Sequence, residues 1–174
     1  GDPDRLRAVA EDFIKHYETR VAEGATVAGK AMFVCSNRNI AYDFYKIVKE
    51  LRPEWTEKKI CDDGVVLSEK DKKELKPMEK IKLVMTRNKD DEKDLFDMLG
   101  TKEDRKEFDR QFKNPKSNFK IAIVVDMWLT GFDVPELDTI YIDKPIQQHT
   151  LIQTISRVNR VCEGKDKGLI VDYI

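Results

Sequence analysis

A run of five consecutive apolar residues, IAIVV at 121–125, constrains the fold of this chain more than any other feature. It is too short to cross a membrane, and β-branched side chains dominate it. Its residues also do not alternate between apolar and polar, as they would in a strand that has one face in water. The run therefore predicts a strand buried on both faces, which is typical of a parallel sheet with helices on both sides.

Further short apolar runs alternate with helical patterns along the chain. The runs lie at 31–35, 81–86, 139–142 and 169–173. Apolar residues at helical spacing occupy 3–22, 40–53 and 101–114, and Thr101 is placed to cap the third helix. This alternation indicates a three-layer α/β fold, with a mainly parallel sheet of about five or six strands and helices on both faces.

The organisation is that of one main domain. We expect residues 1–29 to form an N-terminal packing helix and loop, and 30–174 to form the α/β domain. Residues 53–80 are charged and irregular. Lysines outnumber acidic residues from 72 to 89, which we interpret as a solvated lysine-rich loop. The chain is expected to be part of a longer polypeptide.

Composition limits the possible functions. The net charge of −1 and a pI of about 6.2 exclude a globally basic nucleic-acid binder, so any DNA contact must be a local patch. The three cysteines have no metal-ligand spacing, so buried free thiols and no metal site are expected. Because neither a signal peptide nor a membrane span is evident, we expect a cytoplasmic protein that does not contact a membrane.

The segment after the apolar run at 121–125 carries candidate ligand-binding residues. It reads WLTGFDVP and contains Thr130, Gly131 and Asp133, followed by Pro135. Pro135 prevents an immediate return to regular hydrogen bonding, so a loop is expected at the carboxyl end of the strand. In open α/β sheets ligands bind at that edge.

A predicted helix, QQHTLIQTISRVNRVC at 147–162, carries a second set of candidates. At about 100° per residue, Gln153, Arg157 and Arg160 share an arc of roughly 60°. The apolar residues of this helix lie on the opposite side; they are Leu151, Ile155, Val158 and Cys162. The face is either the solvated side of an amphipathic helix or a polyphosphate-binding surface, for which guanidinium groups are well suited.

The sequence SNRN follows the first predicted strand and precedes a helix. Small polar residues at such a junction commonly cap the helix. The same free backbone N–H groups can hold a phosphate. Ser36, Asn37 and Arg38 are therefore candidates either for capping or for contact with nucleic-acid phosphates.

The sequence TGFDVP followed by QTISRVNR resembles motifs V and VI of superfamily 2 helicases and translocases. Ser156 stands where the glycine of Gln-x-x-Gly-Arg-x-x-Arg is usual. Together with GLIVDY, the pattern is most similar to the restriction (motor) subunit of type I restriction-modification enzymes. The resemblance covers 31–173 and implies that 30–174 is the second of two RecA-like, P-loop NTPase-like domains in a double-stranded DNA translocase.

The resemblance also implies roles at an ATP site between two such domains. Arg157 and Arg160 would be catalytic at the terminal phosphate, with Gln153 assisting. Gly131 and Asp133 would line the nucleotide. ATP and Mg²⁺ would be bound mainly by the first RecA-like domain of the same chain.

The SNRN segment occupies the place of motif IV, so the resemblance implies DNA contact at Ser36, Asn37 and Arg38, and further at Thr130. The implied partners are double-stranded DNA and the modification and specificity subunits of a restriction complex. Two alternatives stay open: another superfamily 2 DNA repair helicase, and a non-catalytic α/β domain that binds a nucleotide or a protein partner.

Two features of the sequence limit its chemistry. No G-x-x-x-x-G-K-[ST] occurs, so the chain is not expected to hydrolyse ATP alone. Asp90, Asp91 and Glu92 follow a predicted strand, but they lie several positions beyond it and among lysines. We therefore reject them as a metal site.

Overall fold

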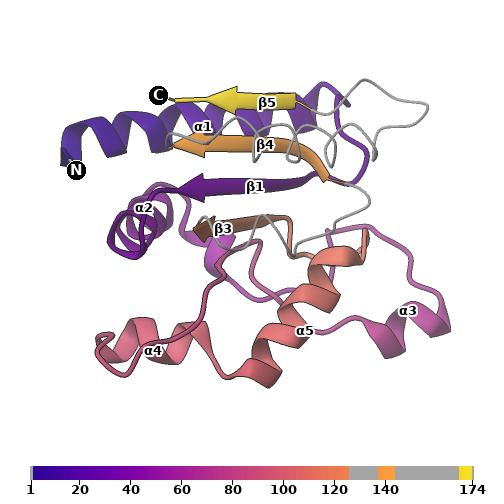
Figure 1. The fold of residues 1–174 in the computed structure, drawn as a ribbon. Coiled ribbons are helices and arrows are strands. Elements are labelled where there is room, and N and C mark those ends of the chain that lie inside the picture. Colours follow the sequence, from indigo (N-terminus) through magenta and orange to yellow (C-terminus); the bar gives the residue numbers. More distant parts are fainter. Residues whose placement is uncertain (1, 126–136, 144–168, 174) are drawn as a thin grey trace, which may run out of the picture.

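The computed structural model describes residues 2–125, 137–143 and 169–173, and they form a single parallel sheet with helices around it (Figure 1). The strands are β1 (Lys30–Cys35), β2 (Ile81–Leu83), β3 (Ile121–Val125), β4 (Leu137–Asp143) and β5 (Leu169–Asp172). Their order is β2-β3-β1-β4-β5, and every neighbouring pair is parallel. The predicted α/β class and the parallel sheet are confirmed.

The helices are α1 (Pro3–Ala22), α2 (Arg38–Leu51), the 3-10 helix η1 (Pro53–Thr56), α3 (Glu69–Glu74), α4 (Lys93–Leu99) and α5 (Lys102–Lys113). Helices α1, α2 and α5 confirm the three predicted helical segments. Helix α3 was not predicted because it buries no residue, and an amphipathic pattern is the signal on which a prediction depends. A capping box between Ser68 and Asp71 begins it instead.

Alternate residues of β1, β3 and β4 face two separate parts of the core. Along β1, Phe33 belongs to the cluster that includes α1 and α2, whereas Met32 and Val34 belong to the cluster that includes Phe112 of α5. Helices therefore cover both faces of the sheet (Figure 1). This arrangement explains why β3 is apolar throughout.

Helix α1 is part of the main core. Phe13 is fully buried, and its ring centroid lies 4.7 Å from that of Tyr141 and 5.2 Å from that of Phe33. The loop after α1 is tied to β4, because the carboxylate of Asp138 accepts hydrogen bonds from the amides of Val27 (2.7 Å) and Gly29 (3.0 Å). The separation of 1–29 from 30–174 stays a prediction, but α1 shares its core with the sheet.

The interpretation of 72–89 as a solvated loop is wrong for Lys82. This lysine lies within β2, and only 4% of it is exposed. Its Nζ lies 2.8 Å from Oε2 of Glu79 and 4.2 Å from the ring centroid of Phe108. A long aliphatic stem lets lysine occupy such a site when its ammonium group is paired.

The thiol of Cys35 is buried at the end of β1, and burial raises its pKa. Cys61 is partly exposed, and Cys162 lies outside the described residues. Among the helices of the described segments, none has the length and apolar character that crossing a membrane requires.

Candidate functional site

Three strands end at the same level on one side of the sheet. Cys35 at the end of β1 is in register with Val125 at the end of β3 and with Asp143 at the end of β4. We call this side of the sheet, defined by Cys35, Val125 and Asp143, the carboxyl edge. In the sequence, residues 36–38 follow Cys35 directly. The predicted loop WLTGFDVP begins three residues after Val125, and the predicted helix at 147–162 begins four residues after Asp143.

Six of the predicted site residues lie outside the described residues. They are Thr130, Gly131, Asp133, Gln153, Arg157 and Arg160. Their roles, and the shared helical face of Gln153, Arg157 and Arg160, therefore remain predictions. The described residues stop at Val125, shortly before the predicted loop at 128–135, and at Asp143, shortly before the predicted helix at 147–162.

Ser36, Asn37 and Arg38 lie at the carboxyl edge, where β1 passes into α2. Oδ1 of Asn37 accepts a hydrogen bond from the amide of Ile40 at 2.9 Å, so Asn37 is the N-cap of α2. The predicted capping role of this segment is confirmed at Asn37. Ser36 and Asn37 are exposed, so they can also reach a ligand beside the first turn of α2.

The guanidinium group of Arg38 is held by a carboxylate. Its Nη2 donates to Oδ1 and Oδ2 of Asp91 at 2.7 and 2.6 Å, and its Nη1 donates to the carbonyl oxygen of Thr86 at 2.6 Å. Oδ2 of Asp91 also accepts from the amide of Asn88 at 2.7 Å. Sequence reasoning rejected Asp91 as a metal ligand and missed this contact, which joins residues 53 positions apart.

The Arg38–Asp91 pair is only partly accessible. The side chain of Asp91 is 9% exposed and that of Arg38 is 27% exposed. Burial opposes ionisation of Asp91, but the hydrogen bonds from Asn88 and Arg38 outweigh it, so the pKa of Asp91 lies below its usual range. Asp91 therefore stays charged near neutral pH and fixes Arg38 at the edge, with part of the guanidinium still open to solvent.

A second arginine reaches the carboxyl edge from α1. Nη2 of Arg5 lies 2.5 Å from Oδ1 of Asp143 and donates to the carbonyl oxygen of Tyr173 at 3.1 Å. The hydroxyl of Tyr173 donates to Oδ2 of Asp12 at 2.8 Å. Helix α1 thus ties together the carboxyl ends of β4 and β5. In the sequence, the predicted helix at 147–162 lies between these two strands.

The described part of the carboxyl edge suits an anion more than a metal ion. It offers the amino end of a fourteen-residue helix, α2, and the two positioned guanidinium groups of Arg5 and Arg38. Within the described ranges, no three His, Cys, Asp or Glu side chains gather closely enough to hold a metal ion. Both nearby carboxylates, Asp91 and Asp143, are engaged by arginine.

Comparison with known proteins places the chain in a family of domains from type I restriction enzyme subunits. A family model described as type I restriction enzyme subunit R domain 3 matches residues 27–174. The HindI type I restriction enzyme endonuclease subunit of Haemophilus influenzae is 38% identical over all of this chain and 15% of its own length. The putative MjaIXP endonuclease subunit of Methanocaldococcus jannaschii is 40% identical over 98% of the chain and 14% of its own length. The chain thus spans about 15% of the length of these relatives.

Solved helicase structures share the fold. Domain 2 of the DEAD-box helicase Mss116p, bound to an RNA duplex, matches with a TM-score of 0.55 at 16% identity, over 99% of this chain and 50% of that one. The Mycobacterium smegmatis helicase Lhr, bound to single-stranded DNA and AMP-PNP, matches with a TM-score of 0.55 at 12% identity, over 94% of this chain and 16% of that one. These likenesses establish a RecA-like helicase domain fold.

Proposed function

Because this chain belongs to the family of type I restriction enzyme subunit R domain 3, we propose that it is the second RecA-like motor domain of an ATP-dependent restriction endonuclease subunit that moves along double-stranded DNA. The first RecA-like domain of the same polypeptide would supply the other half of the ATP site. The complete endonuclease subunit would act with modification and specificity subunits in the cytoplasm.

The observation that supports this proposal most is that three neighbouring strands, β1, β3 and β4, end at the same position along the sheet. Cys35, Val125 and Asp143 are in register across β1, β3 and β4. The segment that resembles motif IV follows Cys35 directly. The segments that resemble motifs V and VI begin at Thr130 and Gln153, five residues after Val125 and ten residues after Asp143. This supports a single site at the carboxyl edge, where parallel α/β sheets bind ligands.

At that site the proposed roles follow from side-chain chemistry. Arg157 and Arg160 would meet the terminal phosphate of ATP bound by the neighbouring domain, and Gln153 would help to orient them. A planar cation there stabilises charge that develops on the transferred phosphoryl oxygens, which can accelerate the reaction by ~10³ or more. Gly131 would allow close approach to the nucleotide, and Asp133 would accept from the ribose.

Two parts of the ATP site must come from elsewhere. The chain has no G-x-x-x-x-G-K-[ST] to cradle the phosphates and no strand that ends in an Asp-Glu pair suited to Mg²⁺. Closure of the two domains on ATP and opening after hydrolysis would then convert turnover into movement along DNA.

The DNA contact is proposed for Ser36, Asn37, Arg38 and Thr130. Arg38 is already oriented by Asp91, so it loses little further conformational freedom when it meets a phosphate. Contacts with phosphates do not discriminate between sequences. The DNA track would therefore be independent of sequence, as a translocase requires.

The test of the motor function uses the complete subunit and measures three properties of each variant. Arg157→Ala and Arg160→Lys should each abolish ATP turnover and translocation, because neither alanine nor the lysine ammonium reproduces the guanidinium fork. The melting temperature and nucleotide-free DNA binding should stay at the wild-type level. Near-normal turnover, or loss of turnover together with unfolding, would refute the assignment.

The DNA contact is tested in the same preparation with Arg38→Ala. The affinity for duplex DNA should fall, and the slope of log affinity against log salt should become shallower by about one. Arg7→Ala is the matched control, because Arg7 is an exposed arginine of α1 paired with Glu50. Equal salt dependence in the two variants would argue against contact through Arg38.

A further inference from the structure

A groove of about 640 Å³ lies between α3 and the end of α5, away from the carboxyl edge. Helix α5 ends at Lys113, shortly before β3 begins at Ile121, so the groove lies near the amino ends of the strands. The six residues of β1 span roughly 20 Å. Figure 1 shows α3 on the side opposite the strand arrowheads, so the groove that α3 borders and the carboxyl edge are separate surfaces.

The groove is basic although the chain as a whole is slightly acidic. Twice as many basic as acidic side chains line it. The basic residues are Lys70, Lys73, Lys76, Arg110, Lys113 and Lys116. All six are exposed, so their charged groups are available to a ligand.

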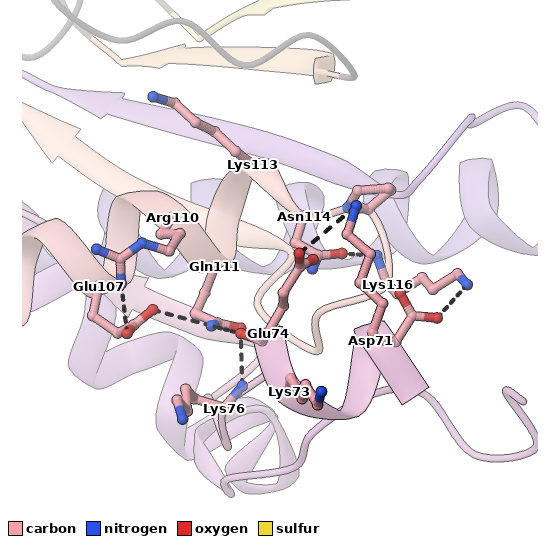
Figure 2. A pocket seen from close by; sticks show the side chains of 12 residues that line it. Asp71, Lys73, Glu74, Lys76, Glu107, Arg110, Gln111, Lys113, Asn114 and Lys116 are labelled. Atoms are coloured by element: carbon pink, nitrogen blue, oxygen red, sulfur yellow. Dashed lines mark hydrogen bonds and ion pairs between the residues drawn. The ribbon is translucent and has the colours of Figure 1, made fainter. Parts of the chain in front are cut away.

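The acidic residues of the groove neutralise only part of this charge. Asp71 pairs with Lys116 at 2.6 Å, and Glu107 pairs with Arg110 at 2.7 Å (Figure 2). Lys73 and Lys76 have no ion-pair partner among the described residues, and no dashed line reaches either ammonium group in Figure 2. These two lysines carry the uncompensated charge.

A buried amide fixes the shape of the groove. Gln111 is 1% exposed, and its Nε2 donates to the carbonyl oxygen of Glu74 at 2.9 Å and to Oε2 of Glu107 at 3.1 Å. Its Oε1 accepts from the amide of Lys76 at 3.2 Å. The end of α3 is thus hydrogen-bonded to α5. These bonds fix the position of the backbone that carries Lys73 and Lys76.

We propose that this groove binds the phosphate backbone of a nucleic acid. All but one of the basic residues are lysines, which are depleted in protein–protein interfaces but common in contacts with phosphates. The amide of Asn114 lines the same groove, and such side chains also bond to phosphates. The groove would hold a stretch of nucleic acid other than the one at the carboxyl edge, and so goes beyond the proposed motor site.

The test is the double variant Lys73→Ala/Lys76→Ala in the complete subunit. Binding of a duplex DNA long enough to reach both surfaces is measured over a salt series. Loss of two phosphate contacts should make the slope of log affinity against log salt shallower by about two. The control is Lys15→Ala/Lys49→Ala, which removes two exposed lysines from α1 and α2 and should leave the slope unchanged.

The outcomes separate this proposal from the motor function. An unchanged slope in the groove variant, with steep salt dependence in the wild type, overturns the groove alone. Loss of association with another subunit, without a change in the slope, would identify an acidic protein as the occupant and would also overturn it. If the alanine variant melts early, Lys73→Gln/Lys76→Gln provides the same measurement with the side-chain bulk retained.

Discussion

At the scale of single residues, the carboxyl edge depends on two arginines that are paired with buried carboxylates far away in the sequence. Arg38 and Asp91 are 53 positions apart, and Arg5 and Asp143 are 138 positions apart. The carboxylates are 9% and 4% exposed, so water screens each pair weakly. Removing either arginine would leave a nearly buried carboxylate unpaired.

We predict that Asp91→Asn destabilises the chain at neutral pH by about 1–3 kcal/mol, because it weakens hydrogen bonds to a charged group. The pKa of Asp91 is lowered in the folded state, so its stabilising contribution is complete above the ordinary carboxyl range and is lost as the pH falls through the folded-state value. The free energy of unfolding, measured by denaturant, should therefore differ between variant and wild type at pH 7 and converge in acid.

Asp90→Asn serves as the control for this experiment, because Asp90 is the exposed neighbour of Asp91. It should change stability by less than about 0.5 kcal/mol at either pH. A difference between Asp91→Asn and wild type that stayed constant from pH 7 into acid would contradict the electrostatic origin of the effect.

At the scale of elements, α1 is a structural part of the sheet domain. Its buried face packs on the aromatic side chains of β1, α2 and β4 through Phe13. Its amino end binds Asp143 and its middle binds Tyr173. The helix thereby connects the core to the carboxyl ends of β4 and β5, and the segment predicted to carry the catalytic arginines lies between these two strands in the sequence.

We predict that Phe13→Ala lowers the free energy of unfolding by about 3–5 kcal/mol, because the side chain is fully buried and its removal leaves a cavity. Glu11→Ala, on the exposed side of the same helix, should cost less than about 0.5 kcal/mol. Chemical denaturation of both variants checks this. A cost below about 1 kcal/mol for Phe13→Ala would mean that α1 does not share the core.

At the scale of the whole molecule, the chain is much shorter than the restriction-enzyme subunits to which it is similar. It spans about 15% of the length of its restriction-enzyme relatives, yet it contains a two-sided core and the beginning of each proposed motif segment. Under the proposed function, this folded domain would hold half of an active site, and the neighbouring domain would hold the other half.

We predict that the 174-residue chain by itself does not turn over ATP, with or without DNA, because no loop in its sequence cradles the nucleotide phosphates. Release of phosphate from ATP by the purified chain is the measurement. A preparation with both arginines replaced, Arg157→Ala/Arg160→Ala, sets the background. Turnover above that background, stimulated by duplex DNA, would contradict the view that the chain supplies half of a site.

The sequence alone determined the strands, the helices α1, α2 and α5, and the caps at Thr101 and Asn37, because these depend on residues that are close along the chain. The apolar run at 121–125 predicted β3, and Thr101 and Asn37 bond to amides three residues away. The family resemblance also rested on short contiguous motifs. The roles of Arg157 and Arg160 rest on the same motifs and remain predictions.

Only the tertiary structure decided the strand order β2-β3-β1-β4-β5, the partners of the edge arginines and the basic groove. Each of these features requires contact between residues that are far apart in the sequence. No local pattern in the sequence predicts which distant residues will meet. Lys82 shows the same limit, because a lysine within a charged segment was expected in solvent but lies in a buried strand. Local pattern specifies the elements, whereas the packing of the sheet and helices specifies which charges face one another.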